Sequence, residues 1–225
     1  MSEYIVEMKH ITKRFPGIVA NDDVSIGIKK GEIFALLGEN GAGKSTLSML
    51  FGMYEPDGGE IWIRGKKEEI HSPSYATKLS IGMVHQHFKL VQNYSITENI
   101  ILGLPVSDKR FGILPYVDLK KAGKKVQELS EHYGLEVNPG DLIEHVGISV
   151  QQRVEILKML YREAEILIFD ELTAVLTPQE INFLLDIIRG LRDKGKTIIL
   201  ITHKLAEIKQ VADRCAILNR GKLID

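Results

Sequence analysis

The sequence predicts an α/β fold: a mainly parallel sheet with flanking helices, an antiparallel β subdomain at the N-terminus and an inserted α-helical subdomain. Three observations predict it. A glycine-rich loop, residues 38–46, lies between an apolar run and a helical pattern. Two further apolar runs, 166–169 and 197–201, flank an amphipathic helical pattern, and strand–helix–strand alternation is typical of parallel sheets. Residues 91–161 are helical in pattern, which indicates an insertion.

The first 90 residues are predicted to contain five strands and one helix. Alternating apolar and polar positions indicate half-buried antiparallel strands, and continuous apolar runs indicate buried strands. The turn residues Glu-Pro-Asp-Gly-Gly at 55–59 precede a short strand. A helix is expected at 44–51, directly after the glycine-rich loop. The strands are expected at 4–11, 24–28, 33–37, 60–63 and 81–85.

The helical stretch is followed by a second series of strands and helices. Within 91–161, turns are expected at Pro105, Pro115 and residues 139–140. After the strand at 166–169 we expect a helix at 178–192, a strand at 197–201, a helix at 204–211 and a strand pair within 215–225. The prediction is a single domain, 1–225, in which residues 1–90 and 162–225 form the β subdomain and the core and residues 91–161 form the helical subdomain.

Composition limits the classes of partner. The 225 residues carry a net charge of -1, with acidic and basic residues interspersed, so a general nucleic-acid surface is not expected. The single cysteine, Cys215, excludes an internal disulfide, suits a reducing cytosol and is expected in a core strand. No apolar run approaches the roughly 18 residues of a membrane span, so any link to a membrane is expected to go through a partner.

The glycine-rich loop predicts the chemistry of the chain. It matches G-x-x-x-x-G-K-[ST] without a mismatch. Glycines let the backbone curl so that its N–H groups surround phosphate oxygens, and the following helix N-terminus adds its positive dipole end. Lys44 can reach the β- and γ-phosphates, Ser45 can bind Mg²⁺ and Thr46 can hold the α-phosphate. The chain is therefore predicted to bind a nucleoside triphosphate through Gly38, Glu39, Asn40, Gly41, Ala42, Gly43, Lys44, Ser45 and Thr46.

Polar residues also follow two of the predicted buried strands. Asp170 is placed to bind Mg²⁺, directly or through water, and Glu171 to polarise the attacking water. Taken alone, the pair would be two solvated carboxylates at a strand end; combined with the phosphate loop, it indicates catalysis. His203 follows the strand at 197–201 and can hold that water in line. A lone histidine is more often structural, so this assignment depends on the other motifs.

The order of these motifs resembles that of the ATP-binding cassette of ABC transporters over essentially the whole chain. The resemblance implies a P-loop NTPase (RecA-like) core, ATP and Mg²⁺ as ligands, and ATP hydrolysis. It implies that Phe15 stacks on adenine, although an ordinary core phenylalanine remains the alternative, and that Gln86 contacts Mg²⁺ and senses a transmembrane partner. Asp170, Glu171 and His203 match the family's magnesium aspartate, catalytic glutamate and switch histidine.

Within the family, residues 83–102 and 173–180 look most like those of importers of simple sugars and nucleosides, which usually carry two cassettes in one polypeptide. The resemblance implies that this chain is the first cassette. The implied partners are a second ATP-binding cassette, transmembrane permease subunits and, indirectly, a solute-binding protein, with no nucleic acid. The implied location is cytoplasmic, peripheral on the inner face of the cell membrane.

One motif of the family is altered. A Leu-Ser-Gly-Gly-Gln or Leu-Ser-Val-Gly signature should precede Gln151, but residues 146–150 are Val-Gly-Ile-Ser-Val. Aligned without a gap, Gly147 takes the serine position and Ser149 the glycine position. Aligned with a gap, Ser149 is the signature serine and the following glycine is missing. Either alignment impairs one contact with the γ-phosphate held by a facing cassette. Leu172, where the family usually has proline, is expected to loosen the turn at Glu171.

The leading prediction is an ATP-hydrolysing subunit that energises import of a sugar or nucleoside through a permease. Two other functions stay open: a regulatory cassette that binds ATP with little hydrolysis, because its signature is altered, and a soluble non-transport ABC ATPase that acts on ribosomes or DNA. The second would be favoured by a long coiled-coil insertion or a basic linker, and the sequence has neither. A small-molecule kinase is disfavoured by the presence of Gln86, Asp170, Glu171 and His203 at the family's spacing.

Overall fold

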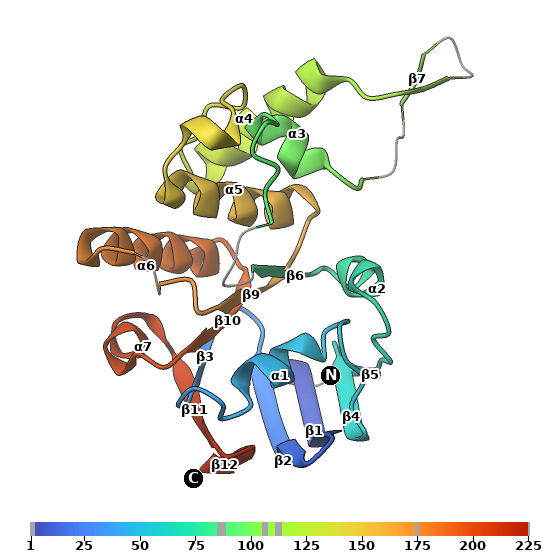
Figure 1. The fold of residues 1–225 in the computed structure, drawn as a ribbon, viewed down its shortest axis with the longest axis vertical. Helices are drawn as coiled ribbons and strands as arrows, with labels where there is room; N and C mark the ends of the chain where they lie inside the picture. The colour runs from blue at the N-terminus through green and yellow to red at the C-terminus, as the bar shows by residue number, and fades with distance from the viewer. Residues whose placement is uncertain (1–2, 85–88, 105–107, 111–113, 174–175, 225) are drawn as a thin grey trace. The chain divides into compact units, whose positions relative to one another are not determined.

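The chain divides into two compact units, residues 1–86 with 164–225 and residues 87–163. The computed structural model describes residues 3–84, 89–104, 108–110, 114–173 and 176–224. Figure 1 shows the elements of both units along the chain. The first unit holds a six-stranded and a four-stranded sheet, and the second is mostly helical.

The six-stranded sheet of the first unit brings the predicted site residues to one edge. Its strands are β3 (Ile33–Leu37), β6 (Ile81–Val84), β9 (Ile166–Asp170), β10 (Thr197–Thr202), β11 (Arg214–Asn219) and β12 (Lys222–Ile224). They lie in the order β12-β11-β3-β10-β9-β6, parallel except for β11 with β12. Leu37 is opposite Thr202, and Asp170 is opposite Ile201. The carboxyl ends of β3, β9 and β10 therefore meet.

The apolar runs behave as predicted because the sheet centre is inaccessible to water. Every residue of β9 and β10 is buried, and so are the first four residues of β3. A parallel strand that is covered on both faces reads as a continuous apolar run in sequence. The predictions of strands at 33–37, 166–169 and 197–201 are therefore confirmed.

The four-stranded sheet is antiparallel, with the order β2-β1-β4-β5. Its strands are β1 (Tyr4–Phe15), β2 (Ile18–Lys29), β4 (Gly58–Ile63) and β5 (Lys66–Lys67). β1 and β2 are longer than predicted, and their pairing continues to Phe15 opposite Ile18. The extension places Phe15 beside the turn between the two strands. Sequence alternation misses it because the register shifts after Ile11.

In the described part of the first unit, four helices accompany the sheets: α1 (Lys44–Met49), α2 (Pro73–Lys78), α6 (Pro178–Asp193) and α7 (Leu205–Val211). A capping box of Thr177 and Glu180 begins α6, where the sequence predicts a helix. The main apolar core includes Leu47 of α1 and Leu50 at its C-cap, with buried residues of both sheets. This packing holds α1, and with it the preceding glycine-rich loop, against the sheet edge. The sequence did not predict α2.

The second unit contains α3 (Ile96–Ile101), α4 (Leu119–Tyr133), a 3-10 turn η1 (Ile143–His145) and α5 (Ile148–Tyr161). It also contains the strand pair β7 (Asp108–Arg110) and β8 (Leu114–Tyr116). The prediction of a turn at Pro115 is wrong, because this residue lies within β8. A two-stranded ribbon has only edge strands, and an edge strand tolerates a residue without an N–H. Pro105 lies outside the described residues.

Cys215 lies in β11 as expected, but it is exposed rather than in the core. Only Leu218 is buried among the residues of β11. The strand is second from the sheet edge, next to the short β12, so its faces are only partly covered. The apolar sequence around Cys215 predicts correctly that the residue lies in a strand. It does not predict whether that strand is buried.

Candidate active site

The glycine-rich loop connects β3 to α1 and is folded against β2. Gly43 has a φ of 100°, and a Cβ there would lie 2.2 Å from the backbone oxygen of Ala20, so no other residue fits. The buried side chain of Asn21 donates from Nδ2 to the Gly43 oxygen at 3.2 Å. Lys44 donates from Nζ to the Glu39 oxygen at 3.0 Å, across the curve of the loop. These hydrogen bonds hold the loop in its curved conformation.

A cavity of about 610 Å³ lies beside this loop, large enough for a nucleotide. Phe15 lies at its apolar part with the exposed side chains of Ile18 and Val19. The Phe15 ring meets the Tyr54 ring edge-on, with 5.3 Å between centroids. The full lining is Phe15, Ile18, Val19, Ala20, Asn40, Gly41, Gly43, Lys44, Ser45, Thr46, Glu171 and Arg220. The cavity therefore joins an apolar wall to the phosphate loop and a carboxylate.

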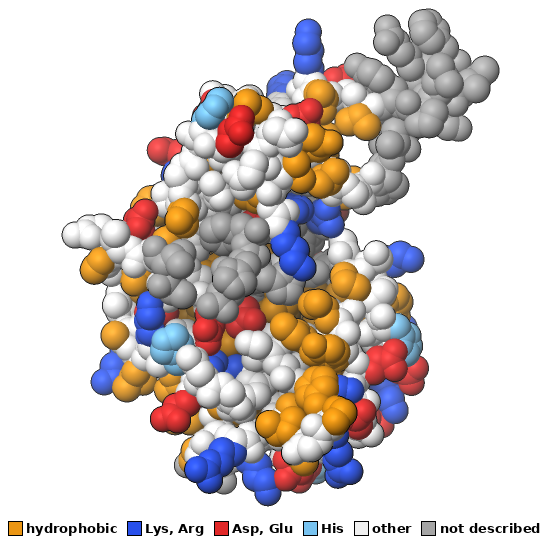
Figure 2. Space-filling model, viewed as in Figure 1, with side chains coloured by type: hydrophobic (Ala, Val, Ile, Leu, Met, Phe, Trp, Pro, Cys, Tyr) orange, Lys and Arg blue, Asp and Glu red, His pale blue; other side chains and the backbone are white. Residues whose placement is uncertain are grey.

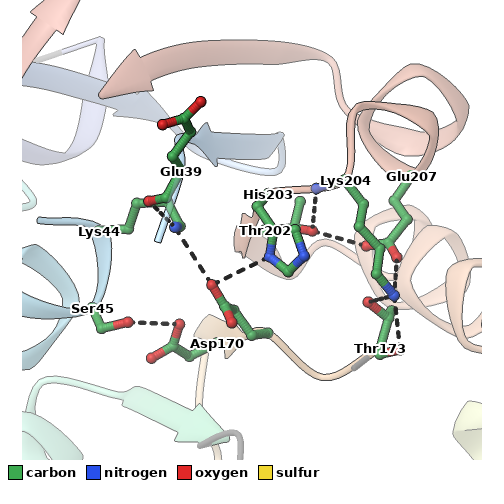
Figure 3. Close-up of polar contacts among 10 residues, drawn as sticks. Glu39, Lys44, Ser45, Asp170, Thr173, Thr202, His203, Lys204 and Glu207 are labelled. Atoms are coloured by element: carbon green, nitrogen blue, oxygen red, sulfur yellow. Dashed lines mark hydrogen bonds and ion pairs between the residues drawn. The ribbon is translucent and has the colours of Figure 1, made fainter. Parts of the chain in front are cut away.

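Asp170 ends β9 directly opposite the loop. Its Oδ1 accepts a hydrogen bond from Ser45 Oγ at 3.3 Å, as drawn in Figure 3. The side chain is 5 % exposed, and this burial raises the pKa of the carboxyl, while the hydrogen bond from Ser45 opposes that rise. The charged form of such a buried carboxylate gains most from a cation placed beside it.

The Glu171 side chain lies between Lys44 at the end of the loop and His203, which follows β10. Its Oε1 lies 3.4 Å from Lys44 Nζ and 3.6 Å from His203 Nδ1. Its side chain is 15 % exposed and that of His203 is 41 % exposed. Glu171 has a φ of 51°, a conformation that costs free energy for a residue with a side chain and that is concentrated at functional sites. Figure 3 shows Lys44 and His203 converging on this part of the site.

A second set of contacts, which the sequence did not reveal, fixes the turn that carries His203. Lys204 donates from Nζ to the backbone oxygen of Thr173 at 3.0 Å and to its Oγ1 at 3.2 Å. Thr202 Oγ1 accepts from the Lys204 backbone N–H at 3.0 Å and donates to Glu207 Oε2 at 3.1 Å (Figure 3). The turn after β10 is thereby tied to the turn after β9. In the sequence, only the position of Lys204 next to His203 could have indicated these contacts.

The chain matches the family model for the ABC transporter over residues 21–174. It belongs to the ABC transporter family. It is 58 % identical to the nucleoside import ATP-binding protein NupA of Lactococcus lactis subsp. cremoris, over 100 % of this chain and 44 % of that protein. It is 55 % identical to the guanosine import ATP-binding protein NupO of Bacillus subtilis, over 98 % of this chain and 42 % of that protein. The chain thus spans less than half the length of these relatives.

Other relatives of this ABC cassette and solved structures agree on the fold. The ribose import ATP-binding protein RbsA 1 of Rubrobacter xylanophilus is 41 % identical over 98 % of this chain and 43 % of that protein. A crystal structure of the ADP conformation of an ATP-binding cassette of an ABC transporter has a TM-score of 0.87 with this chain. It is 22 % identical and covers 99 % of this chain and 90 % of its own. The P-loop NTPase fold is therefore confirmed. An ABC cassette binds ATP, and ATP hydrolysis is the activity of the family.

The residues of the altered signature begin α5 in the second unit of the cassette. Gly147 is the N-cap of this helix, with no side-chain cap, and a Cβ built on it has nothing within 4 Å. Ser149 is the second helical residue. Gln151 donates from Nε2 to the oxygens of Val146 at 3.1 Å and Ile143 at 3.4 Å, which holds the chain before the helix. The altered segment therefore forms a regular helix start with room for a larger residue.

Two other expectations for the cassette concern single residues. Gln86 lies outside the described residues. Leu172, in place of the family's proline, is 3 % exposed. Its side chain is therefore part of the core beside Glu171. Whether the turn is looser than with proline stays a prediction.

The Ser45 and Asp170 oxygens also suit a magnesium ion. Hydroxyl and carboxylate oxygens are the ligands that Mg²⁺ prefers, and it usually completes its shell with water and substrate phosphates. Among the described residues there is no group of three or more His, Cys, Asp or Glu side chains that could hold a metal by itself. The buried Asp170 carboxylate and the Ser45 hydroxyl, whose oxygens lie 3.3 Å apart, are a donor set that fits such an ion.

Proposed function

We propose that this chain is an ATP-hydrolysing cassette that energises nucleoside import through a membrane permease. The observation that carries hydrolysis is the position of Glu171 Oε1, between Lys44 Nζ at 3.4 Å and His203 Nδ1 at 3.6 Å. A carboxylate beside the phosphate-binding lysine is where the base for attack on a γ-phosphate is needed. Nucleoside as the solute is supported by the identity values, which are 58 and 55 % with nucleoside and guanosine importers but 41 % with a ribose importer.

Each side chain of the site has one task in this proposal. Lys44 donates to the β- and γ-phosphates, and the backbone N–H groups of the loop, with Thr46, hold the rest of the phosphate chain. Ser45 and Asp170 hold Mg²⁺, with Gln86 as a further ligand, and Mg²⁺ when bound neutralises charge on the phosphate oxygens. Glu171 accepts a proton from the attacking water. His203 donates to the γ-phosphate and keeps the water in line.

Two further residues have a role in this proposal: Phe15 binds the adenine, and Lys204 holds the turn that carries His203. Phe15 stacks on the base at the apolar part of the cavity, where Ile18 and Val19 are exposed. The Lys204 contacts with Thr173 keep His203 and Glu171 in register, so that both act on the same water. Catalysis in this design comes from positioning and charge stabilisation, as is usual for phosphoryl transfer.

The partners we propose are a second ATP-binding cassette, permease subunits in the membrane and, indirectly, a solute-binding protein. Among the described residues, no helix is long and apolar enough to cross a membrane. Figure 2 shows acidic and basic side chains interspersed over the visible face, without a surface of one sign. A peripheral position at the inner face of the membrane, reached through the permease, fits both observations.

Deletion of the gene in its host is expected to abolish uptake of radiolabelled nucleosides and to leave ribose uptake intact. The native gene should restore uptake, and the gene with Glu171→Gln should not, because transport depends on hydrolysis. Loss of ribose uptake with normal nucleoside uptake would reassign the solute to a sugar. Normal uptake of both would contradict a role in import.

The altered signature supports a second candidate function, a regulatory cassette that binds ATP and hydrolyses it slowly. In the head-to-tail dimer that the proposal assumes, the signature donates to the γ-phosphate of the facing site. Gly147 has no hydroxyl to donate, and Ser149 puts a Cβ where the family has glycine. The loop, Asp170, Glu171 and His203 are unaffected, so the site of this cassette stays complete when the facing cassette carries a normal signature.

Gly147→Ser combined with Ser149→Gly is expected to strengthen ATP-dependent dimerisation tenfold or more. One regained hydrogen bond to a charged phosphate is worth about 1.5–3 kcal/mol, and a side chain at Gly147 has room. Sedimentation with ATP in a Glu171→Gln background measures the effect, and Gly147→Ala is the matched control without a hydroxyl. Equal dimerisation of the original and restored chains would show that this segment does not meet the γ-phosphate.

A further inference from the structure

Arg220 lies in the tight turn between β11 and β12, at the point where two cavities meet. It lines the nucleotide cavity of about 610 Å³. It also lines a neighbouring cavity of about 810 Å³, which contains Glu39 and His203. Among the described residues, Asn40 of the phosphate loop is the only other one that the two linings share. The turn therefore borders the phosphate loop at Asn40, and its Gly221 also lies against the backbone of Val19 and Ala20.

The backbone of this turn is fixed to the phosphate loop. The Gly221 N–H donates to the Ala42 oxygen at 3.0 Å, and the Gly221 oxygen accepts from the Asp22 N–H at 2.8 Å. These bonds join the turn to the loop on one side and to β2 on the other. The backbone of Arg220 consequently has a defined position relative to the phosphate loop.

Arginine is an unfavourable residue for the turn itself. Asn219 pairs with Lys222, so the turn has two central residues, Arg220 with a φ of 47° and Gly221 with a φ of 79°. Positive φ at both central positions defines the hairpin turn that prefers Asn-Gly. Asparagine would therefore be the more stable residue at position 220. The turn geometry thus gives no reason for a guanidinium here.

The charge of Arg220 is available to a ligand. The side chain is exposed, and within the described parts of the chain its guanidinium has no ion pair. The neighbouring cation differs, because Lys222 Nζ lies 3.1 Å from Asp22 Oδ2 and lines neither cavity. A guanidinium carries five N–H donors in a planar fork that matches phosphate oxygens.

We propose that Arg220 binds the polyphosphate chain of the nucleotide, as a second cation opposite Lys44. This assignment rests on the proposed binding of ATP. Lys44 is buried within the loop, whereas Arg220 reaches the phosphates from the rim next to Asn40. Its contribution grows with the charge of the ligand, so Arg220 favours ATP over AMP.

Arg220→Asn is the decisive variant, because turn stability and phosphate binding change in opposite directions. Asparagine relieves the positive φ, so the midpoint of thermal unfolding should stay the same or rise. The affinity for ATP should fall about tenfold, equivalent to about 1.4 kcal/mol, and the affinity for AMP less than about twofold. Arg220→Lys should recover part of the ATP affinity. Lys222→Ala is the matched control for a cation of the same hairpin that lines neither cavity.

Equilibrium binding of fluorescent ATP and AMP analogues to the folded chain, at low and high salt, separates the outcomes. A steeper fall of ATP affinity with salt for the original chain than for Arg220→Asn is expected. Unchanged ATP affinity of Arg220→Asn, or an equal loss for Lys222→Ala, would overturn the proposal. Binding that is unaffected by Lys44→Ala would instead overturn the assignment of the nucleotide site itself.

Discussion

Glu171→Gln is expected to lower the rate of ATP hydrolysis by about 100-fold or more while ATP remains bound. A general base contributes about 10²–10⁴-fold to such a reaction, and an amide is a poor acceptor for the proton of water. The amide oxygen can still accept hydrogen bonds from Lys44 and His203, which lie 3.4 and 3.6 Å from Glu171 Oε1. The substitution should therefore change chemistry and leave the geometry of the site intact.

Steady-state phosphate release and equilibrium ATP binding, measured on the same preparations, test this expectation. Glu165→Gln is a suitable control, because Glu165 is a partly exposed carboxylate of the same segment that pairs with Arg64 at 2.8 Å. It should hydrolyse ATP at the original rate. If Glu171→Gln retains hydrolysis within a few-fold, another group accepts the proton, and His203 becomes the first residue to replace.

Lys44→Ala is expected to weaken ATP binding by about 10- to 100-fold. Lys44 is 4 % exposed, and its ammonium provides the charged donor inside the loop. Hydrogen bonds to charged groups contribute about 1.5–3 kcal/mol each, so the loss of one such bond accounts for the whole of that range. The substitution also leaves Glu171 without its nearest cation.

A fluorescent ATP analogue measures the affinity, and thermal unfolding checks that the variant is folded. The exposed Lys30 gives a control, Lys30→Ala, that removes the same charge at the other end of β3 from the loop. Unchanged affinity for Lys44→Ala would mean that the phosphate loop is not the nucleotide site. Loss of affinity together with loss of the folded state would require the milder Lys44→Gln to separate the two effects.

The sequence predicted the parts of the fold whose causes are local. The strands β3, β9 and β10 are buried on both faces, so their apolar runs were visible without knowledge of their neighbours. The phosphate loop is a contiguous motif, and the parallel order of the strands brings Asp170 and His203 to it. The contacts of Lys44 with Glu171, and of Glu171 with His203, follow from that order.

Other features depend on residues that are distant in sequence. Asn21 reads as an ordinary polar residue of β2, and only the fold places it under Gly43. The depth of Cys215 depends on the neighbours of β11 in the sheet and not on its own segment. The turn at Arg220 is recognisable as a hairpin, but its position beside Asn40 results from the pairing of β11 with β3.

The nucleotide cavity is closed by segments from both ends of the cassette. Its walls include Phe15, Ile18, Val19 and Ala20 from β1 and β2 and Arg220 from the β11–β12 hairpin, and the Gly221 N–H donates to the Ala42 oxygen. During synthesis on the ribosome, the loop at 38–46 emerges long before the hairpin that supports it. The nascent chain therefore lacks this wall of the cavity until residue 221 has left the exit tunnel, and we expect ATP at the proposed site to stabilise the cassette fully only after this hairpin has been made.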